Sequence, residues 1–126
     1  RTYDRSVQDM VETRCHQIVQ GVAAAMGCTA EIAYERGYPA TVNHERETAF
    51  ATRVAAEVGR ATGECDPVMG AEDFAFMLER RPGAYLFLGQ GDSAGLHHPR
   101  YDFNDAIAPI GASFFARLVE HAQPRV

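Results

Sequence analysis

The sequence predicts an α/β fold, and three observations lead to that prediction. Apolar residues recur at helical spacing in several segments. Residues 84–88 form a continuous apolar run, which is typical of a strand covered by helices on both faces. A long loop, residues 89–104, follows that run, and open α/β folds place their sites beyond the ends of strands. This loop is therefore the first region in which to look for function.

The N-terminal segment predicts a long amphipathic helix followed by a strand. Asp4 or Ser6 is a candidate N-cap, and Gly27 is a typical residue just beyond a helix end. Residues 29–34 then alternate weakly between polar and apolar side chains, a pattern that predicts a half-exposed strand running into a turn.

The rest of the chain predicts three more helices and a second strand at residues 84–88. The second helix is expected to begin near Asn43 and to stop near Gly63. A short third helix is expected over residues 71–79, and a last helix is expected from about Ala106 or Pro109 to His121. The intervening segment 37–45 contains Gly, Pro and Asn, and it predicts a boundary between a domain of residues 1–42 and a domain of residues 43–126.

Composition excludes several classes of function. A net charge of −5 provides no basic surface for neutralising phosphates, so nucleic acid is not an expected partner. All twelve basic residues are Arg, which excludes Schiff-base and P-loop lysine chemistry. The three cysteines lack C-x-x-C spacing, which favours a reducing, cytoplasmic setting over a disulfide framework. No apolar run is long enough to span a membrane, so a membrane is not expected as a partner either.

The long loop contains a formal match to the G-x-S-x-G nucleophile motif, with Ser93 as the serine. Asp102, Asp105 and His121 lie downstream in the order that a serine hydrolase of that fold uses. That motif, however, needs a helix directly after the serine, and Leu96-His-His-Pro99 does not start one. A serine hydrolase therefore remains a minor alternative.

Two further features of the sequence carry chemistry. His97 and His98 lie in the long loop, and neutral imidazole is the commonest protein ligand for transition metals. Adjacent side chains of an extended segment point in opposite directions, so at most one of the two is expected to reach a given metal. Glu72 lies in the first turn of the third helix, where a carboxylate also favours the helix dipole. His16, His44 and His121 are expected at the surface.

Several ordered motifs resemble one enzyme family when they are taken together. They are Met69-Gly-Ala-Glu-Asp-Phe-Ala-Phe, Pro82-Gly-Ala-Tyr-Leu-Phe-Leu-Gly89, Leu96-His-His-Pro-Arg-Tyr-Asp-Phe-Asn-Asp105 and Ala108-Pro-Ile-Gly-Ala112. They resemble the C-terminal part of the hippurate hydrolase/aminoacylase-like amidohydrolases, which are related to metallopeptidases. Arg1-Thr-Tyr-Asp, the first helix and Gly37-Tyr-Pro-Ala-Thr-Val-Asn43 resemble the second half of that family's lid, or dimerisation, domain.

The resemblance implies roles for four residues. His97 matches a ligand of a dinuclear centre of divalent metal, zinc or manganese, and His98 falls at the variable position. Arg1 matches a lid residue that pairs with the substrate carboxylate, for which a guanidinium fork is suited. Asn43 and Glu72 match positions that line the cleft. The remaining metal ligands and the general base, a Glu, belong to the family's N-terminal half, so this chain is expected to contain no catalytic base.

We therefore expect part of a lid domain followed by the C-terminal half of an α/β metallohydrolase domain. The intact enzyme is expected to hydrolyse the amide bond of N-acyl amino acids, to pair as a homodimer through the lid and to need the N-terminal half of the same protein. The chain alone is expected to be inactive. A non-catalytic association module, pairing through residues 30–34, is the alternative interpretation from another class.

Overall fold

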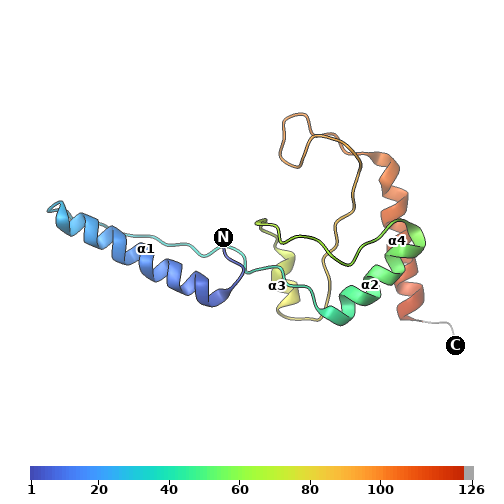
Figure 1. Cartoon of the computed structure of the whole chain (residues 1–126), viewed down its shortest axis with the longest axis horizontal. Coiled ribbons are helices and arrows are strands. Elements are labelled where there is room, and N and C mark those ends of the chain that lie inside the picture. The colour runs from blue at the N-terminus through green and yellow to red at the C-terminus, as the bar shows by residue number, and fades with distance from the viewer. Residues whose placement is uncertain (124–126) are drawn as a thin grey trace. The chain divides into compact units, whose positions relative to one another are not determined.

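The computed structural model of the chain describes residues 1–123, which form four α-helices and one short 3-10 helix (Figure 1). These elements are α1 (Arg5–Ala25), α2 (Glu45–Val58), α3 (Phe74–Leu78), η1 (Asp105–Ile107) and α4 (Ala108–Ala122). The chain divides into two compact units. Unit 1 holds residues 1–42 and 67–81, and unit 2 holds residues 43–66 and those from Pro82 onward. The functional division between residues 42 and 43 stays a prediction.

The predicted α/β fold class is wrong, because residues 1–123 contain no β-strand. Neither predicted strand, at 29–34 or at 84–88, pairs with another extended segment there. A strand exists only as part of a ladder of hydrogen bonds between two backbones, and a pattern of side chains along one segment does not supply the second backbone. The described elements are helices joined by segments of irregular structure.

The ends of α1 follow the signals in the sequence. Asp4 is the N-cap, and its carboxylate accepts hydrogen bonds from the backbone N–H groups of Ser6 (2.7 Å) and Val7 (3.2 Å). At the other end, Cys28 N donates to Ala23 O (2.8 Å), and Gly27, with φ of 68°, closes the helix in the left-handed conformation. This is the Schellman arrangement, which satisfies carbonyl groups of the last turn.

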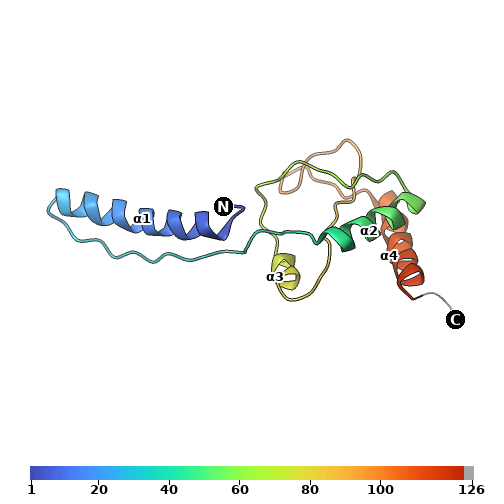
Figure 2. The same cartoon turned by 60° about the horizontal axis from the view of Figure 1, so that its bottom comes forward.

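The segment that follows α1 runs back along that helix (Figure 2). Gln20 Nε2 donates to Ala30 O (3.0 Å), and the rings of His16 and Tyr34 lie 6.0 Å apart. Ala30, Ile32 and Tyr34 are half-buried, whereas the residues between them are exposed. The predicted alternation of exposed and half-buried side chains is therefore present, but these side chains pack against the helix α1 rather than within a sheet.

Arg36 joins the far end of this segment to α1. Its guanidinium forms ion pairs with Glu12 and with Asp9, the latter at 2.6 Å. Hydrogen bonds to Glu12 and then to Asp9 raise the pKa of Arg36 above its ordinary value. Since Arg36 is charged at every accessible pH in any case, the consequence is geometric: the pairs fix the register of the segment on α1.

The second part of unit 1 contains α3. Ala75 and Leu78 are buried, at 0 % and 6 % exposed. The ring of Phe76 packs edge-on against Tyr38, with centroids 5.6 Å apart, and Arg5 of α1 pairs with Glu79 at 2.5 Å. These contacts tie residues 67–81 to residues 1–42, although the two stretches are distant in sequence.

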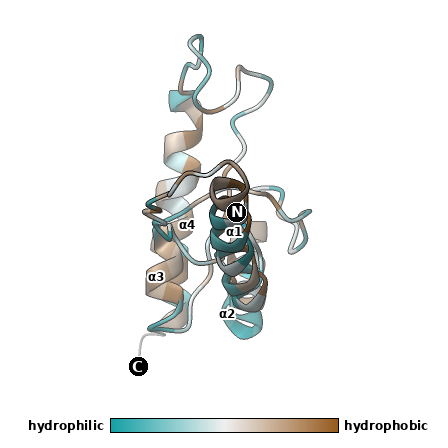
Figure 3. Cartoon of the chain, turned by 90° about the vertical axis from the view of Figure 1, so that its left-hand side faces the viewer, coloured by the Kyte–Doolittle hydropathy of each residue, from teal (hydrophilic) through white to brown (hydrophobic). Residues whose placement is uncertain are grey.

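Unit 2 is built on the packing of α2 against α4. Ala51 and Val54 of α2 are buried, and Figure 3 shows hydrophobic colouring along α4. His121 of α4 lies 2.9 Å from a carboxylate oxygen of Glu57 of α2. The second helix ends at Val58, earlier than the predicted stop near Gly63, because Gly59 already interrupts it.

The apolar run at residues 84–88 is half-buried at Ala84 and Tyr85 and exposed at Leu86–Leu88, contrary to the expectation of burial on both faces. Phe87 is 69 % exposed and Leu88 is 49 % exposed. No helix of the described residues is long and apolar enough to cross a membrane.

Candidate functional site

The loop 89–104 places His97 in an unusual backbone conformation. Its φ is 66°, the only positive value found among the non-glycine residues 1–123. His98 N donates to Gly95 O (3.1 Å), so His97 occupies the third position of a four-residue turn, where type II turns require positive φ. A non-glycine residue held in this region stores strain, and such residues cluster at functional sites.

The side chain of His97 is exposed, and within residues 1–123 its imidazole forms no hydrogen bond. Both ring nitrogens are therefore available to an external partner. A neutral imidazole with this freedom fits the role of one metal ligand.

His98 is engaged differently. Its Nδ1 accepts a hydrogen bond from the backbone N–H of Arg100 (3.0 Å), and its carbonyl accepts one from Tyr101 N (2.9 Å). Because Nδ1 is an acceptor, the proton of the neutral ring lies on Nε2. His98 thus builds the turn that follows His97, so that the two adjacent histidines have distinct roles in the loop.

The side-chain amide of Asn43 forms hydrogen bonds with the backbone of this chain. Its amide nitrogen donates to Tyr85 O (2.9 Å), and its amide oxygen accepts from Tyr85 N (2.7 Å). The amide group therefore pairs with the backbone of residue 85 as a neighbouring strand would. Its expected place in the wall of a substrate cleft stays a prediction.

His44 is the residue that the sequence did not point to. It was expected at the surface, but it is half-buried, and Gly83 N donates to its Nδ1 (3.2 Å) while its own N–H donates to Gly83 O (3.0 Å). Asn43 and His44 together hold residues 83–85. No local pattern in the sequence announces a bond between residues this far apart in the chain.

The two other predicted site residues lie in unit 1. Arg1 donates from its guanidinium to Met69 O, which leaves most of its N–H groups free to bind a carboxylate. The Glu72 carboxylate accepts from Phe74 N (3.3 Å), at the start of α3. This bond agrees with the interpretation that Glu72 supports the helix terminus, and its role in a cleft stays a prediction.

Ser93 is not placed as a nucleophile among the described residues. Its hydroxyl accepts from Gln90 Nε2 (2.7 Å) and donates to Ala94 O (3.3 Å), and neither partner is a general base. Nor does a helix follow, because the backbone makes turns at residues 96–100.

The described part of the chain does not form a metal site alone. Within residues 1–123 no group of three or more His, Cys, Asp or Glu side chains is arranged to hold a metal ion. A catalytic zinc needs about three protein ligands, so His97 fits as one donor, but the described residues do not supply a complete set.

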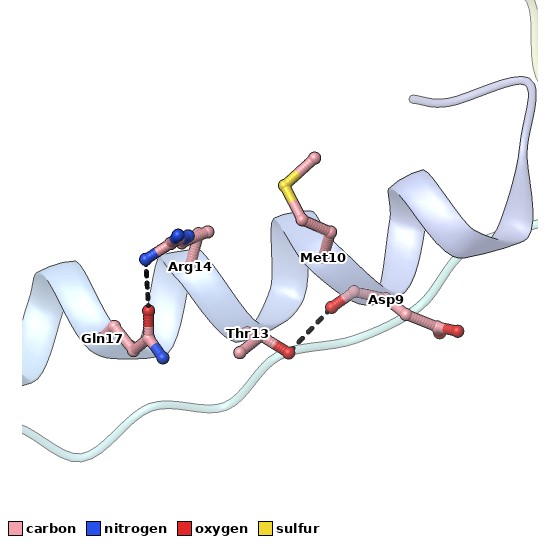
Figure 4. A pocket seen from close by; sticks show the side chains of 5 residues that line it. All are labelled: Asp9, Met10, Thr13, Arg14 and Gln17. Atoms are coloured by element: carbon pink, nitrogen blue, oxygen red, sulfur yellow. Dashed lines mark hydrogen bonds between the residues drawn. The ribbon is translucent and has the colours of Figure 1, made fainter.

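A shallow pocket on α1 contains none of the predicted site residues. It is lined by Asp9, Met10, Thr13, Arg14 and Gln17. Figure 4 shows that Arg14 donates to Gln17, at 3.0 Å, and that Thr13 donates to the Asp9 carbonyl, at 2.9 Å. These polar groups are used within the helix, and no catalytic pair is present in the pocket.

Comparison with protein families gives a match to peptidase family M20/M25/M40 over residues 5–121. The chain belongs to this family. A hippurate hydrolase of Campylobacter jejuni is 32 % identical over 121 residues, which cover 94 % of this chain and 32 % of that protein. The loop carrying His97 lies within the residues that match the family.

Two further relatives carry different printed activities. An N-acetylcysteine deacetylase of Bacillus subtilis is 26 % identical, and a thermostable carboxypeptidase 1 of Saccharolobus solfataricus is 31 % identical. In both comparisons the match covers 94 % of this chain and 31 % of the relative. The chain thus spans about a third of the length of these curated relatives. No solved structure matches it significantly.

Proposed function

We propose that this chain is the C-terminal part of a metal-dependent amidohydrolase that cleaves the amide bond of N-acyl amino acids. Membership of peptidase family M20/M25/M40 supports the reaction class. The hippurate hydrolase and the N-acetylcysteine deacetylase among the relatives, both named for N-acylated amino acids, support the substrate class. The share of those relatives that the chain covers supports its being part of a longer enzyme.

The observation that carries the proposal is the conformation of His97. It stands at positive φ on an exposed turn, with an imidazole that forms no hydrogen bond within residues 1–123. In its neighbour His98, by contrast, Nδ1 accepts a hydrogen bond from Arg100 N within the turn. In our proposal His97 donates one ring nitrogen to a zinc or manganese ion, and the other ligands and the general base come from elsewhere in the enzyme. A bound metal of this kind polarises a carbonyl oxygen and lowers the pKa of water.

The other residues of the chain have supporting roles in this proposal. Arg1 orients the carboxylate of the substrate through N–H groups that Met69 O does not use. Asn43 holds the backbone of Tyr85, which leads into the loop of His97. Glu72 stands at the start of α3 and is proposed to face the substrate from there.

The test compares two adjacent substitutions in the whole enzyme. His97→Ala is expected to lower kcat/KM by more than the roughly 100-fold that loss of an outer-shell partner of a metal ligand causes. His98→Asn is expected to stay within about threefold of the natural enzyme, because an Asn oxygen also accepts the N–H two residues on. Zinc content, measured by mass spectrometry, should fall in the first variant only.

Equal and small losses in the two variants would contradict the assignment of His97. Retention of full zinc content by His97→Ala would contradict it as well. Activity that survives exhaustive treatment with a chelator would rule out the metal-dependent reaction altogether.

A further inference from the structure

Gln90 joins the two arms of the loop that carries His97. It is half-buried at the beginning of the loop, and its carbonyl accepts a hydrogen bond from Asn104 Nδ2 (3.0 Å) at the end. The two ends of the loop are thereby held together at Gln90 and Asn104, with the turn of His97 between them.

The side-chain amide of Gln90 makes four more hydrogen bonds. Its Nε2 donates to Ser93 Oγ (2.7 Å) and to Asp102 O (3.2 Å). Its Oε1 accepts from Tyr101 OH (3.3 Å) and from Asn104 N (3.3 Å). An amide group offers two donors and two acceptor sites, so every hydrogen-bonding site of this side chain is used.

The partners of Gln90 stand on both sides of His97. Ser93 precedes His97 in the sequence, and Tyr101 and Asp102 follow it. Asn104 Oδ1 also accepts a hydrogen bond from Ala106 N (3.1 Å), so the network continues into η1, which leads directly into α4. A loop of this length would otherwise lose much conformational freedom when His97 is bound in one position.

We propose that Gln90 is a positioning residue for His97. Its amide closes the loop and holds both arms of it at the distance that keeps residues 95–98 in their turn. Only Gln satisfies all four bonds: Glu has no donor, Asn is one methylene shorter, and Leu has neither donor nor acceptor. The connection to metal binding rests on the function proposed above, whereas the closure of the loop does not.

The first experiment measures the loop without reference to activity. Trypsin cleaves after Arg100, which is exposed between His97 and Tyr101. In Gln90→Leu the rate of cleavage after Arg100, followed by mass spectrometry, is expected to rise about tenfold, because cleavage reports local opening. Gln90→Glu, which keeps the acceptor oxygens, is expected to be intermediate. The matched control is Gln20→Leu, which removes the bond to Ala30 in unit 1 and should leave this rate unchanged.

The second experiment measures zinc binding by the whole enzyme. Gln90→Leu is expected to raise the zinc dissociation constant about tenfold, with kcat recovered by excess zinc and KM nearly unchanged. His97→Ala should not be recovered in this way, because the ligand itself is gone. Gln20→Leu should bind zinc as the natural enzyme does.

The outcomes separate the two proposals. An unchanged cleavage rate after Arg100 in Gln90→Leu overturns the role of Gln90. Faster cleavage with unchanged zinc affinity, while His97→Ala loses zinc, also overturns the positioning role. Faster cleavage in Gln90→Leu together with full zinc binding by His97→Ala overturns the proposed function and leaves Gln90 as the residue that closes the loop.

Discussion

Asp4 shows how one side chain couples protonation to the formation of a helix. Its carboxylate accepts hydrogen bonds from the Ser6 hydroxyl and from the N–H groups of Val7 and Ser6, and these bonds lower its pKa below the ordinary value of 3.8. A pKa that is lower in the folded state stabilises the fold above the unfolded value, and this stabilisation is lost as the pH falls through the folded value.

The helicity of α1 is therefore expected to decrease as the pH falls below the ordinary pKa of Asp4 and through its lowered value, because the N-cap carboxylate is then protonated. In Asp4→Asn this part of the loss should be absent, because Asn is also a good N-cap and does not titrate. Far-UV circular dichroism of both proteins as a function of pH measures the difference. Identical acid titration curves would show that Asp4 does not control the helix terminus.

The local structure around His97 could not be predicted from the individual residues of the sequence. The sequence indicated that at most one of the two adjacent histidines would reach a given metal, on the assumption of an extended backbone. In the structure the two histidines differ for another reason. His97 lies in a turn with positive φ, whereas Nδ1 of His98 accepts a hydrogen bond from Arg100 N. Neither feature has a local signature, because Leu-His-His-Pro does not contain the Gly or Asn that normally announces positive φ. The metal role of His97 itself stays a prediction.

At the scale of the elements, helices were predictable where their end signals are local. Asp4 and Gly27 mark the two ends of α1. The last helix lies at Ala108–Ala122, close to its predicted limits. The two predicted strands were wrong because a strand depends on a distant partner. Residues 30–36 pack on α1, and residues 83–85 bond to Asn43 and His44.

Two glycines, Gly21 within α1 and Gly27 just beyond its C-terminal end, lead to opposite predictions. A Cβ at Gly21 would have no other heavy atom within 4 Å, so Gly21→Ala is expected to stabilise the helix by about 1 kcal/mol. Gly27 also has open space around it, but its φ is 68°, so Gly27→Ala is expected to destabilise the protein by about 1 kcal/mol. Urea denaturation of the two variants checks the signs. Stabilisation by both would show that α1 does not end in the left-handed conformation.

At the scale of the whole molecule, the described residues bury few of their apolar side chains. Large apolar side chains of α1, such as Met10, Ile18 and Val22, are more than half exposed. The buried hydrophobic residues found within residues 1–123 are Ala51, Val54, Ala75 and Leu78. Helical periodicity correctly indicated apolar faces, but periodicity does not say what covers them.

A chain with so small a core is expected to unfold in a broad transition and to bind the dye ANS strongly before unfolding. Thermal unfolding followed by circular dichroism and by ANS fluorescence measures both properties. The whole enzyme, as the control, should give a sharper transition and bind less dye. A steep transition of the chain alone, without dye binding, would show that its apolar faces are covered in solution.

The exposed run at Leu86–Leu88 has a practical consequence for anyone who handles this polypeptide. Leu86, Phe87 and Leu88 are apolar and uncharged, and they are followed by Gly89 rather than by a charge. Arg80 and Arg81 lie too far upstream to act as direct gatekeepers against aggregation. Stock solutions are therefore best kept dilute and freshly prepared, since self-association through these residues would compete with every measurement of binding or turnover.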